Sequence, residues 1–137
     1  MKRAIKFRGK RYDNGDWVVG DLQMGDDDHI PMIGVVGPGR WVDYTQVHEE
    51  TIGQFTGLHD KNGEEIYEGD IIKQIGYSGN VKAVVQFDKG CFMCGWHHGS
   101  STQRTPRLIQ SRCEVLGNIH DNPDYWKEEK ELTNYKK

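Results

Sequence analysis

Short apolar runs alternate with glycine-containing turns along the whole chain, and this pattern constrains the fold more than any other feature. Seventeen of the 137 residues are glycine, and they are spread along the chain rather than clustered. Apolar runs recur roughly every 8–12 residues, between turn signals such as Asn14-Gly15 and Asn62-Gly63. Short runs with frequent turns are typical of strands, so the sequence predicts a mainly β, antiparallel fold.

The expected elements form one domain over residues 1–137, because a chain of this length supports a single core. It comprises an N-terminal β region over about 1–55 and a barrel-like, SH3-like meander over about 56–120. Asn122 is a typical helix N-cap and Pro123 suits the first helical position, which predicts one C-terminal helix over about 123–132. The expected strands are 4–11, 17–24, 30–36, 41–47, 71–77, 81–87, 91–96 and 113–119.

Composition excludes several classes of protein. The net charge of -3 argues against a surface devoted wholly to nucleic acid. No run approaches the roughly 18 apolar residues of a membrane helix, and no apolar segment follows the basic start, so neither a membrane span nor a signal peptide is expected. Three cysteines, an odd number, suit a reducing compartment. We therefore expect a cytoplasmic protein that carries no cofactor.

A basic N-terminal strand is the first candidate site. Alternation places Lys6, Arg8 and Lys10 on one expected exposed face, with Arg11 following directly. Such a row could follow a phosphate backbone, and Tyr12 and Trp17 lie close enough in sequence to stack on bases. The alternative interpretation is an edge strand whose lysines block aggregation. Given the net negative charge, nucleic acid is a possible partner that the sequence does not favour.

A cysteine and histidine group is the second candidate, as a zinc site. The possible ligands are Cys91, Cys94, His97 or His98, and Cys113. However, a strand over 91–96 would turn Cys91 and Cys94 to opposite faces. Buried or half-buried thiols are therefore the favoured interpretation, and no metal site is expected.

Catalytic motifs are not found in the sequence. It contains no G-x-S-x-G elbow, no P-loop and no G-x-G-x-x-G fingerprint after an expected strand. The acidic run Asp26–His29 lacks the alternate spacing of calcium loops and is expected to be a solvated loop. The sequence thus favours a protein that is not an enzyme.

The stretch "TGLHDKNGEEIYEGDII", from Thr56 to Ile72, is the densest in the chain and could be either a carboxylate site or a folding element. Asp60 and Asn62 are typical turn formers, and Gly63 suits the positive φ of such a turn. A role in folding is therefore favoured over chemistry. The residues assigned to turns and bends are Gly57, Asp60, Asn62, Gly63, Gly69 and Asp70.

This central stretch, with both ends of the chain, resembles the YopX-like family of bacteriophage and prophage proteins. The resemblance rests on the runs Gln54–Leu58, Asp60–Gly63 and Ile66–Ile71, on "IKFRGK", and on "EVLGNIHDNPDYW". It implies a small phage-encoded cytoplasmic protein and implies no reaction. Residues 24–41 and 97–112 match nothing in the family pattern, and they are the loops where we expect a specific partner to bind.

The resulting expectation is a non-enzymatic phage or prophage accessory protein that acts as a binding or assembly module. We expect it to be a homo-oligomer, with a host or phage protein as a further possible partner. The alternatives are a nucleic-acid-binding accessory protein that uses the basic N-terminal strand and a small zinc-binding protein.

Overall fold

A computed structural model describes residues 4–24, 30–76, 79–88, 91–95 and 112–124. The described part is mainly β, with antiparallel strands, which confirms the predicted fold class. The chain divides into two compact units, residues 1–57 and residues 58–137. No helix within the described ranges is long and apolar enough to cross a membrane.

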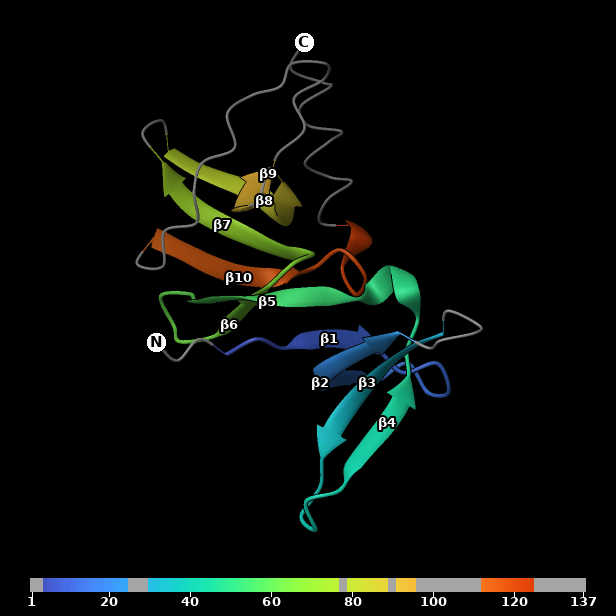
Figure 1. Cartoon of the computed structure of the whole chain (residues 1–137). Coiled ribbons are helices and arrows are strands. Elements are labelled where there is room, and N and C mark those ends of the chain that lie inside the picture. The colour runs from blue at the N-terminus through green and yellow to red at the C-terminus, as the bar shows by residue number, and fades with distance from the viewer. Residues whose placement is uncertain (1–3, 25–29, 77–78, 89–90, 96–111, 125–137) are drawn as a thin grey trace. The chain divides into compact units, whose positions relative to one another are not determined.

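The first unit contains strands in the hydrogen-bonded order β4-β3-β2-β1-β5 (Figure 1). β2 divides its pairing, since its first half, from Trp17 to Gly20, pairs with β1 and its second half, from Asp21 to Met24, pairs with β3. The elements are β1 (Phe7–Lys10), β2 (Trp17–Met24), β3 (Pro31–Val36), β4 (Val42–Gln46), the 3-10 helix η1 (Glu49–Thr51) and β5 (Gly53–His59), whose last two residues belong to the second unit.

The core of the first unit forms where β1, β3 and the segment after β4 meet. Ile33 and Val47 are buried there, and a Cβ atom added to Gly9 would lie only 3.0 Å from the Cβ of Val47. Glycine therefore lets the backbone of β1 approach both side chains. β1 pairs with β2 on one side and β5 on the other, so the interpretation of this basic segment as an edge strand was wrong.

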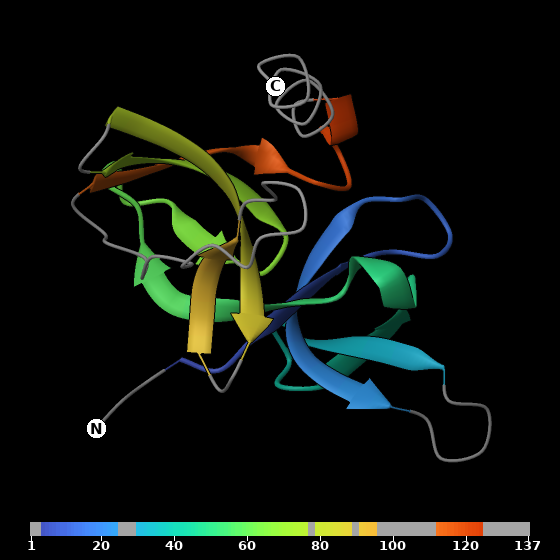
Figure 2. The same cartoon turned by 90° about the horizontal axis from the view of Figure 1, so that it is seen from above.

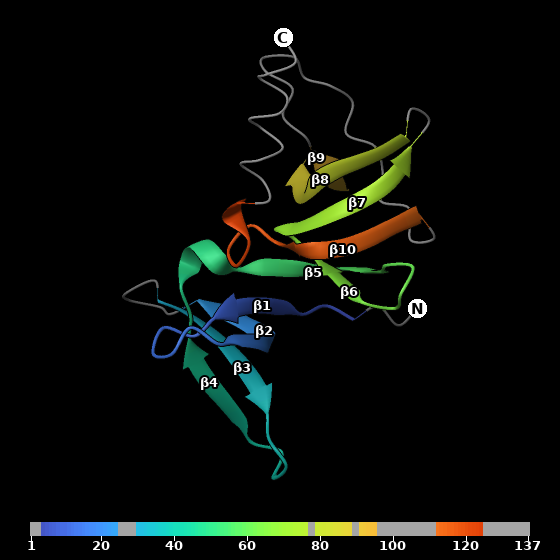
Figure 3. The same cartoon turned by 180° about the vertical axis from the view of Figure 1, so that it is seen from behind.

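The second unit is built on the four-stranded sheet β10-β7-β8-β9, in which β8 and β9 run side by side (Figure 2) and β10 lies beside β7 (Figure 3). β6 also belongs to this unit by sequence, but it is the last strand of the six-stranded sheet, next to β5 in the strand order. Leu58 and Val115 pack against a buried core. The strands are β6 (Glu65–Tyr67), β7 (Asp70–Gly76), β8 (Gly79–Asp88), β9 (Cys91–Gly95) and β10 (Cys113–Asn118). The core consists of Ile66, Ile72, Ala83, Val85 and Cys113.

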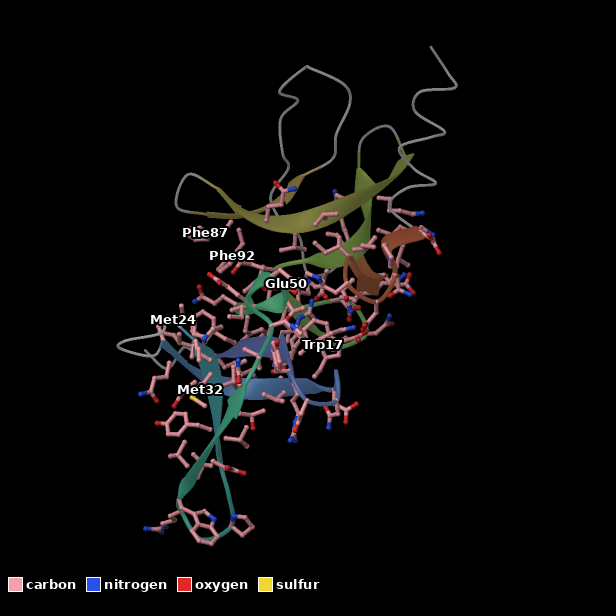
Figure 4. The ribbon with its side chains drawn as sticks, turned by 90° about the vertical axis from the view of Figure 1, so that its right-hand side faces the viewer. Trp17, Met24, Met32, Glu50, Phe87 and Phe92 are labelled. Carbon is pink, nitrogen blue, oxygen red and sulfur yellow. The ribbon has the colours of Figure 1, made fainter. Side chains whose placement is uncertain are left out.

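The expected strands are confirmed, with differences at their ends. The C-terminal helix expected over 123–132 lies outside the described residues except for Pro123 and Asp124, which are helical. Alternation within the expected strand 81–87 places Phe87 on the same face as the buried Val85, but the side chain of Phe87 is 55% exposed and rests edge-on against Phe92, at 5.1 Å between ring centroids (Figure 4). Pairing with β7 ends at Val84, so among the described strands β9 alone pairs with this end of β8.

The Asp60 turn joins β5 to β6 and is fastened by one carboxylate. The backbone N–H of Asp60 donates to the carbonyl of Glu64 at 2.8 Å, and Asp60 Oδ1 accepts the N–H groups of Asn62 and Glu64 at 2.8 and 2.9 Å. Gly63 has a φ of 85°, which glycine adopts without steric cost. The carboxylate thus replaces water for two N–H groups that the turn leaves unpaired.

The same carboxylate reaches β10. Asp60 Oδ2 accepts the N–H of Val115 at 2.9 Å, and the N–H of Lys61 donates to the carbonyl of Cys113 at 3.0 Å. The turn therefore covers the outer edge of β10, the first strand in the sheet order. Asp70 plays a related role at the start of β7, because its Oδ2 accepts the N–H of Tyr67 at 2.7 Å inside the buried core.

Ionisation of Asp60 is favoured by this arrangement. Burial acts to raise the pKa of the Asp60 carboxyl, but hydrogen bonds from Val115, Glu64 and Asn62, with the charge of Lys61, outweigh it and lower the pKa overall. The folded unit therefore holds Asp60 as a carboxylate more strongly than the unfolded chain does.

Replacing Asp60 with alanine should destabilise the second unit by about 3 kcal/mol, because three N–H groups lose a charged acceptor. Glu64→Ala is the matched control, since its side chain lies exposed in the same turn, and it should change stability by less than about 0.5 kcal/mol. Urea unfolding followed by far-UV circular dichroism measures both. Equal stability of the two variants would contradict the role given to Asp60.

Acid should remove part of this stability through Asp60. Its folded pKa lies below its unfolded pKa, so its contribution is present above roughly pH 4 and is lost as the pH falls through the folded pKa. The free energy of unfolding of Asp60→Asn should therefore fall less steeply from pH 5 to pH 2 than that of the wild type. Asp16→Asn, at an exposed position, should keep most of the wild-type slope. Parallel slopes for wild type and Asp60→Asn would contradict the assignment.

Candidate interaction surface on the β3–β4 hairpin

The β3–β4 hairpin extends beyond the strand that supports it. β3 and β4 pair from Met32–Gln46 to Val36–Val42 without a bulge, whereas β2 pairs with β3 only as far as Gly34. The outer residue pairs therefore belong to a two-stranded ribbon whose turn lies away from β1 and β2 (Figure 1). Two-stranded ribbons are marginally stable alone, so apolar side chains on this one require a reason.

Apolar side chains gather on this ribbon. Among the described residues, eleven large apolar side chains are exposed, and five of these lie between positions 35 and 44. Trp41 is 72% exposed and Val36 is 65% exposed. Concentrated apolar exposure of this kind marks a contact surface more often than single exposed residues do. The members of this hairpin surface are Val35, Val36, Trp41, Val42 and Tyr44.

Three of these side chains share one face of the ribbon. A Cβ atom added to Gly34 would lie 2.7 Å from both Cε1 of Tyr44 and Cγ1 of Val42, so glycine makes room there for both side chains. Val36 pairs with Val42 and joins them by the alternation of the pleat. Ile33, which lies on the opposite face, is fully buried in the core. The ribbon is thus apolar on both faces, and the core accounts for only one of them.

The turn holds the aromatic tip in place. The N–H of Gly37 donates to the carbonyl of Trp41 at 2.9 Å, and the N–H of Arg40 donates to the carbonyl of Gly37 at 3.1 Å. A Cβ atom on Gly37 would come within 2.9 Å of Nε1 of Trp41, so the indole lies against this glycine. Its position is therefore set by the turn even though the ring is exposed.

Arg40 carries backbone strain. Its φ of 63° is the one positive value found at a non-glycine position in the described ranges. Such a conformation costs an ordinary side chain about 1–2 kcal/mol, and Gly39 stands immediately before it. Strain of this kind gathers at functional sites. Arg, Trp and Tyr are also the residues that dominate binding energy in protein interfaces, and this tip presents Arg40, Trp41 and Tyr44.

The basic N-terminal residues lie over aromatic rings of the first unit. Lys6 Nζ is 4.9 Å from the ring centroid of Phe55, while Arg8 Cζ and Lys10 Nζ are 4.6 and 5.4 Å from that of Trp17. These cation–π contacts tie the three cations to the fold of this unit. The side chains are half-buried rather than a fully exposed row.

Arg11 is held apart from this group. Its guanidinium donates to both carboxylate oxygens of Asp13, from Nε at 3.0 Å and from a terminal nitrogen at 2.9 Å. The hydrogen bond from Arg11 lowers the pKa of Asp13. The four basic residues of the sequence hypothesis are thus divided between ring contacts and an ion pair.

Of the cysteines of the zinc hypothesis, Cys113 lies in β10 of the second unit. Cys113 is fully buried in the core of the second unit, where burial, followed by the charge of Asp60, raises the pKa of its thiol. Zinc binds the thiolate, which this environment disfavours. Cys91 and Cys94 lie in β9, and His97 and His98 lie outside the described residues. The part of the chain that the structure describes holds no group of three or more potential metal ligands.

Gly57 lies inside β5, so its assignment to a turn or bend was wrong, whereas Asp60, Asn62, Gly63 and Gly69 lie between strands and Asp70 begins β7. Gly57 and Gly69 have φ values of 86° and 89°, and Asn62 donates its N–H to Asp60 within the turn. None of these residues lies on the hairpin surface. Sequence reasoning did not identify that surface, although residues 24–41 had been expected to bind a partner. The sequence signal for the hairpin surface was the alternation of two apolar residues, Val42 and Tyr44, which lie on the face opposite Ile33.

Comparison with known proteins places the chain in a family. The family model described as "YopX protein" matches residues 6–127. The crystal structure of protein EF1440 from Enterococcus faecalis is similar in fold, with 23% sequence identity and a TM-score of 0.54, over 91% of this chain and 99% of that one. No match was found among curated proteins.

Arg40→Gly should raise the free energy of unfolding of the first unit by about 1 kcal/mol, because glycine relieves the positive φ. Gly15→Ala is the converse control. Gly15 has a φ of 77° with nothing within 4 Å of an added Cβ, so this variant should lose about 1 kcal/mol through backbone strain alone. Thermal unfolding compares the two. A less stable Arg40→Gly variant would show that the arginine is not strained.

Proposed function

The chain belongs to the YopX family, and from that premise we propose that it is a non-enzymatic binding or assembly module whose contact surface is the β3–β4 hairpin. The observation that carries the proposal is the five exposed apolar side chains concentrated between positions 35 and 44. The surface joins an exposed, positioned indole to a strained arginine, which suits recognition of a protein. It offers no nucleophile beside a base, so binding rather than catalysis is the activity proposed.

The biological setting is part of the proposal. The family resemblance of the central stretch supports a phage or prophage accessory protein that acts in the cytoplasm of a bacterial host, as a homo-oligomer or with a host or phage protein.

We also propose that the second unit is an SH3-like barrel. Two observations support this fold assignment, namely the antiparallel strand order β10-β7-β8-β9 and the bulge between Val115 and Gly117.

The nucleic-acid alternative is less well supported. The charged groups of Lys6, Arg8 and Lys10 lie over aromatic rings. To bind nucleic acid, they would have to contact phosphates while they keep these ring contacts. Binding of DNA or RNA at low salt that disappears when these three charges are reversed would favour the alternative.

Trp41→Ala should abolish partner capture and leave the fold intact. The indole is 72% exposed, so its loss should change the free energy of unfolding by less than about 1 kcal/mol. The tagged protein is used to capture partners from a bacterial host lysate, and mass spectrometry compares wild type with the variant. Phe87→Ala is the matched control, because Phe87 is another exposed aromatic residue, on β8. Capture of the same proteins by wild type and Trp41→Ala would count against the hairpin surface.

A further inference from the structure

Asparagine followed by glycine occurs twice in the chain, at Asn14-Gly15 and at Asn62-Gly63. Asparagine is thermolabile in proteins, and a following glycine makes it most reactive, because a residue without a side chain leaves its backbone nitrogen open to the asparagine Cγ. Both pairs are exposed, and a Cβ atom added to either glycine would meet nothing within 4 Å. Access of water therefore does not distinguish the two pairs, whereas their hydrogen bonds do.

Loss of the asparagine amide requires the backbone nitrogen of the glycine to act as a nucleophile. This nitrogen loses its proton to water and bonds to Cγ of the asparagine, while Nδ2 leaves as ammonia, and a succinimide ring results. Water then opens the ring at Cγ, which gives aspartate, or at the main-chain carbonyl, which gives isoaspartate. The peptide nitrogen must first leave its own hydrogen bond and approach the side chain, so a firmly held turn slows the reaction.

The Asp60 turn holds the second pair firmly. The N–H of Gly63 donates to the carbonyl of Asp60 at 3.0 Å. The N–H groups on either side, those of Asn62 and Glu64, both donate to the same carboxylate oxygen. Deprotonation of Gly63 would place a negative charge beside this carboxylate, which Coulomb repulsion opposes. The carboxylate also binds β10, so the turn opens only at the expense of the second unit.

The β1–β2 loop, which contains the first pair, is fastened differently. The N–H of Gly15 donates to the carbonyl of Arg11 at 2.9 Å, and the N–H of Arg11 donates to the carbonyl of Asp16 at 2.8 Å. The residues from Tyr12 to Asp16 are all exposed. The guanidinium of Arg11 pairs with the Asp13 carboxylate and offsets its charge. Local opening of this loop therefore costs little more than the bonds of the loop itself.

The side chain of Asn14 is also positioned for attack. Its Oδ1 accepts the N–H of Asp16 at 2.9 Å, which holds the amide carbonyl over the Gly15 peptide unit as in an Asx turn. The same oxygen gains negative charge when the nitrogen adds to Cγ, so this hydrogen bond stabilises the tetrahedral intermediate. Asn62, by contrast, contributes its backbone N–H to the Asp60 turn.

We propose that Asn14 is a site of spontaneous deamidation in the folded protein, through a succinimide formed with Gly15, and that the Asp60 turn shields the identical pair Asn62-Gly63. The product places a new carboxylate in a loop that already contains Asp13 and Asp16. Isoaspartate also adds a methylene group to the main chain between β1 and β2. The β1–β2 loop therefore changes its charge and its length with time, and no enzyme is needed.

Peptide mapping of the full chain tests both parts of the proposal. The protein is kept at neutral pH for several weeks, in buffer or in urea, and is digested with pepsin in acid, where succinimide formation is slow. Mass spectrometry follows the gain in mass at each asparagine, and fragmentation distinguishes isoaspartate from aspartate. In buffer, Asn14 should deamidate about tenfold faster than Asn62 or more, and a tenfold ratio corresponds to about 1.4 kcal/mol of activation free energy. In urea the two rates should converge, because the turn no longer holds Gly63.

Two variants separate the chemistry from the fold. Asn14→Gln keeps the amide but lengthens the side chain, so the succinimide does not form and this position should stay unmodified. Asp60→Ala should raise the rate at Asn62 in buffer by about tenfold and leave the rate at Asn14 unchanged; circular dichroism verifies that the variant is folded. If it does not fold, hydrogen exchange of the wild type replaces it, since the N–H of Gly63 should exchange more slowly than that of Gly15.

Any of four results would overturn the inference. The first is an Asn14 that stays intact in buffer but deamidates in urea, and the second is an Asn62 that reacts as fast as Asn14 in the folded chain. The third is a product that contains aspartate without isoaspartate, because direct hydrolysis would then replace the succinimide. The fourth is an unchanged rate at Asn62 in folded Asp60→Ala, or, where exchange is used, a Gly63 N–H that exchanges as fast as that of Gly15.

Discussion

One carboxylate organises the second unit. Asp60 is buried and accepts three backbone N–H groups, two from its own turn and one from Val115 in β10. Burying a charge is costly unless hydrogen bonds replace the water that it loses, and here each of these bonds also removes an unpaired backbone donor. The strand it fastens carries Cys113 into the core. The local turn and the packed core are thus stabilised by the same group, and loss of either weakens the other.

The outer strands β10 and β4 differ in how far their backbone hydrogen bonds are satisfied within the chain. This difference links the stability of each strand to the proposed function. The Asp60 turn covers the edge of β10 and pairs the N–H of Val115 and the carbonyl of Cys113 within the chain. β4 has its edge covered only near Gln46 and carries exposed apolar residues on the adjoining face. An edge that is satisfied internally has no free energy to gain from a partner strand, whereas an open one has. Binding is therefore most favourable where internal pairing is least complete.

Most of the strands could be predicted because alternation and turn residues are local signals. Asn62-Gly63 marked its turn by composition alone, and β2 was predicted with the bounds that the structure has. The reach of Asp60 to Val115 could not be predicted, since the two residues are 55 positions apart and no local pattern joins them. The positive φ of Arg40 could not be predicted, because the residue before it, Gly39, is better suited to a positive φ. The basic segment was misjudged as an edge because alternation does not reveal how many neighbours a strand has.

The divided pairing of β2 has a consequence for how such a chain can change. Four residues of β2 pair with β1 and the next four pair with β3, so β2 supports the hairpin through Asp21–Met24, and within the described residues its outer pairs have no further strand beside them. Substitutions, or even added residue pairs, beyond Gly34 would leave the core around Ile33 and Val47 intact. The scaffold and the proposed contact surface can therefore change independently, so the chemistry of the hairpin could be altered without loss of the fold.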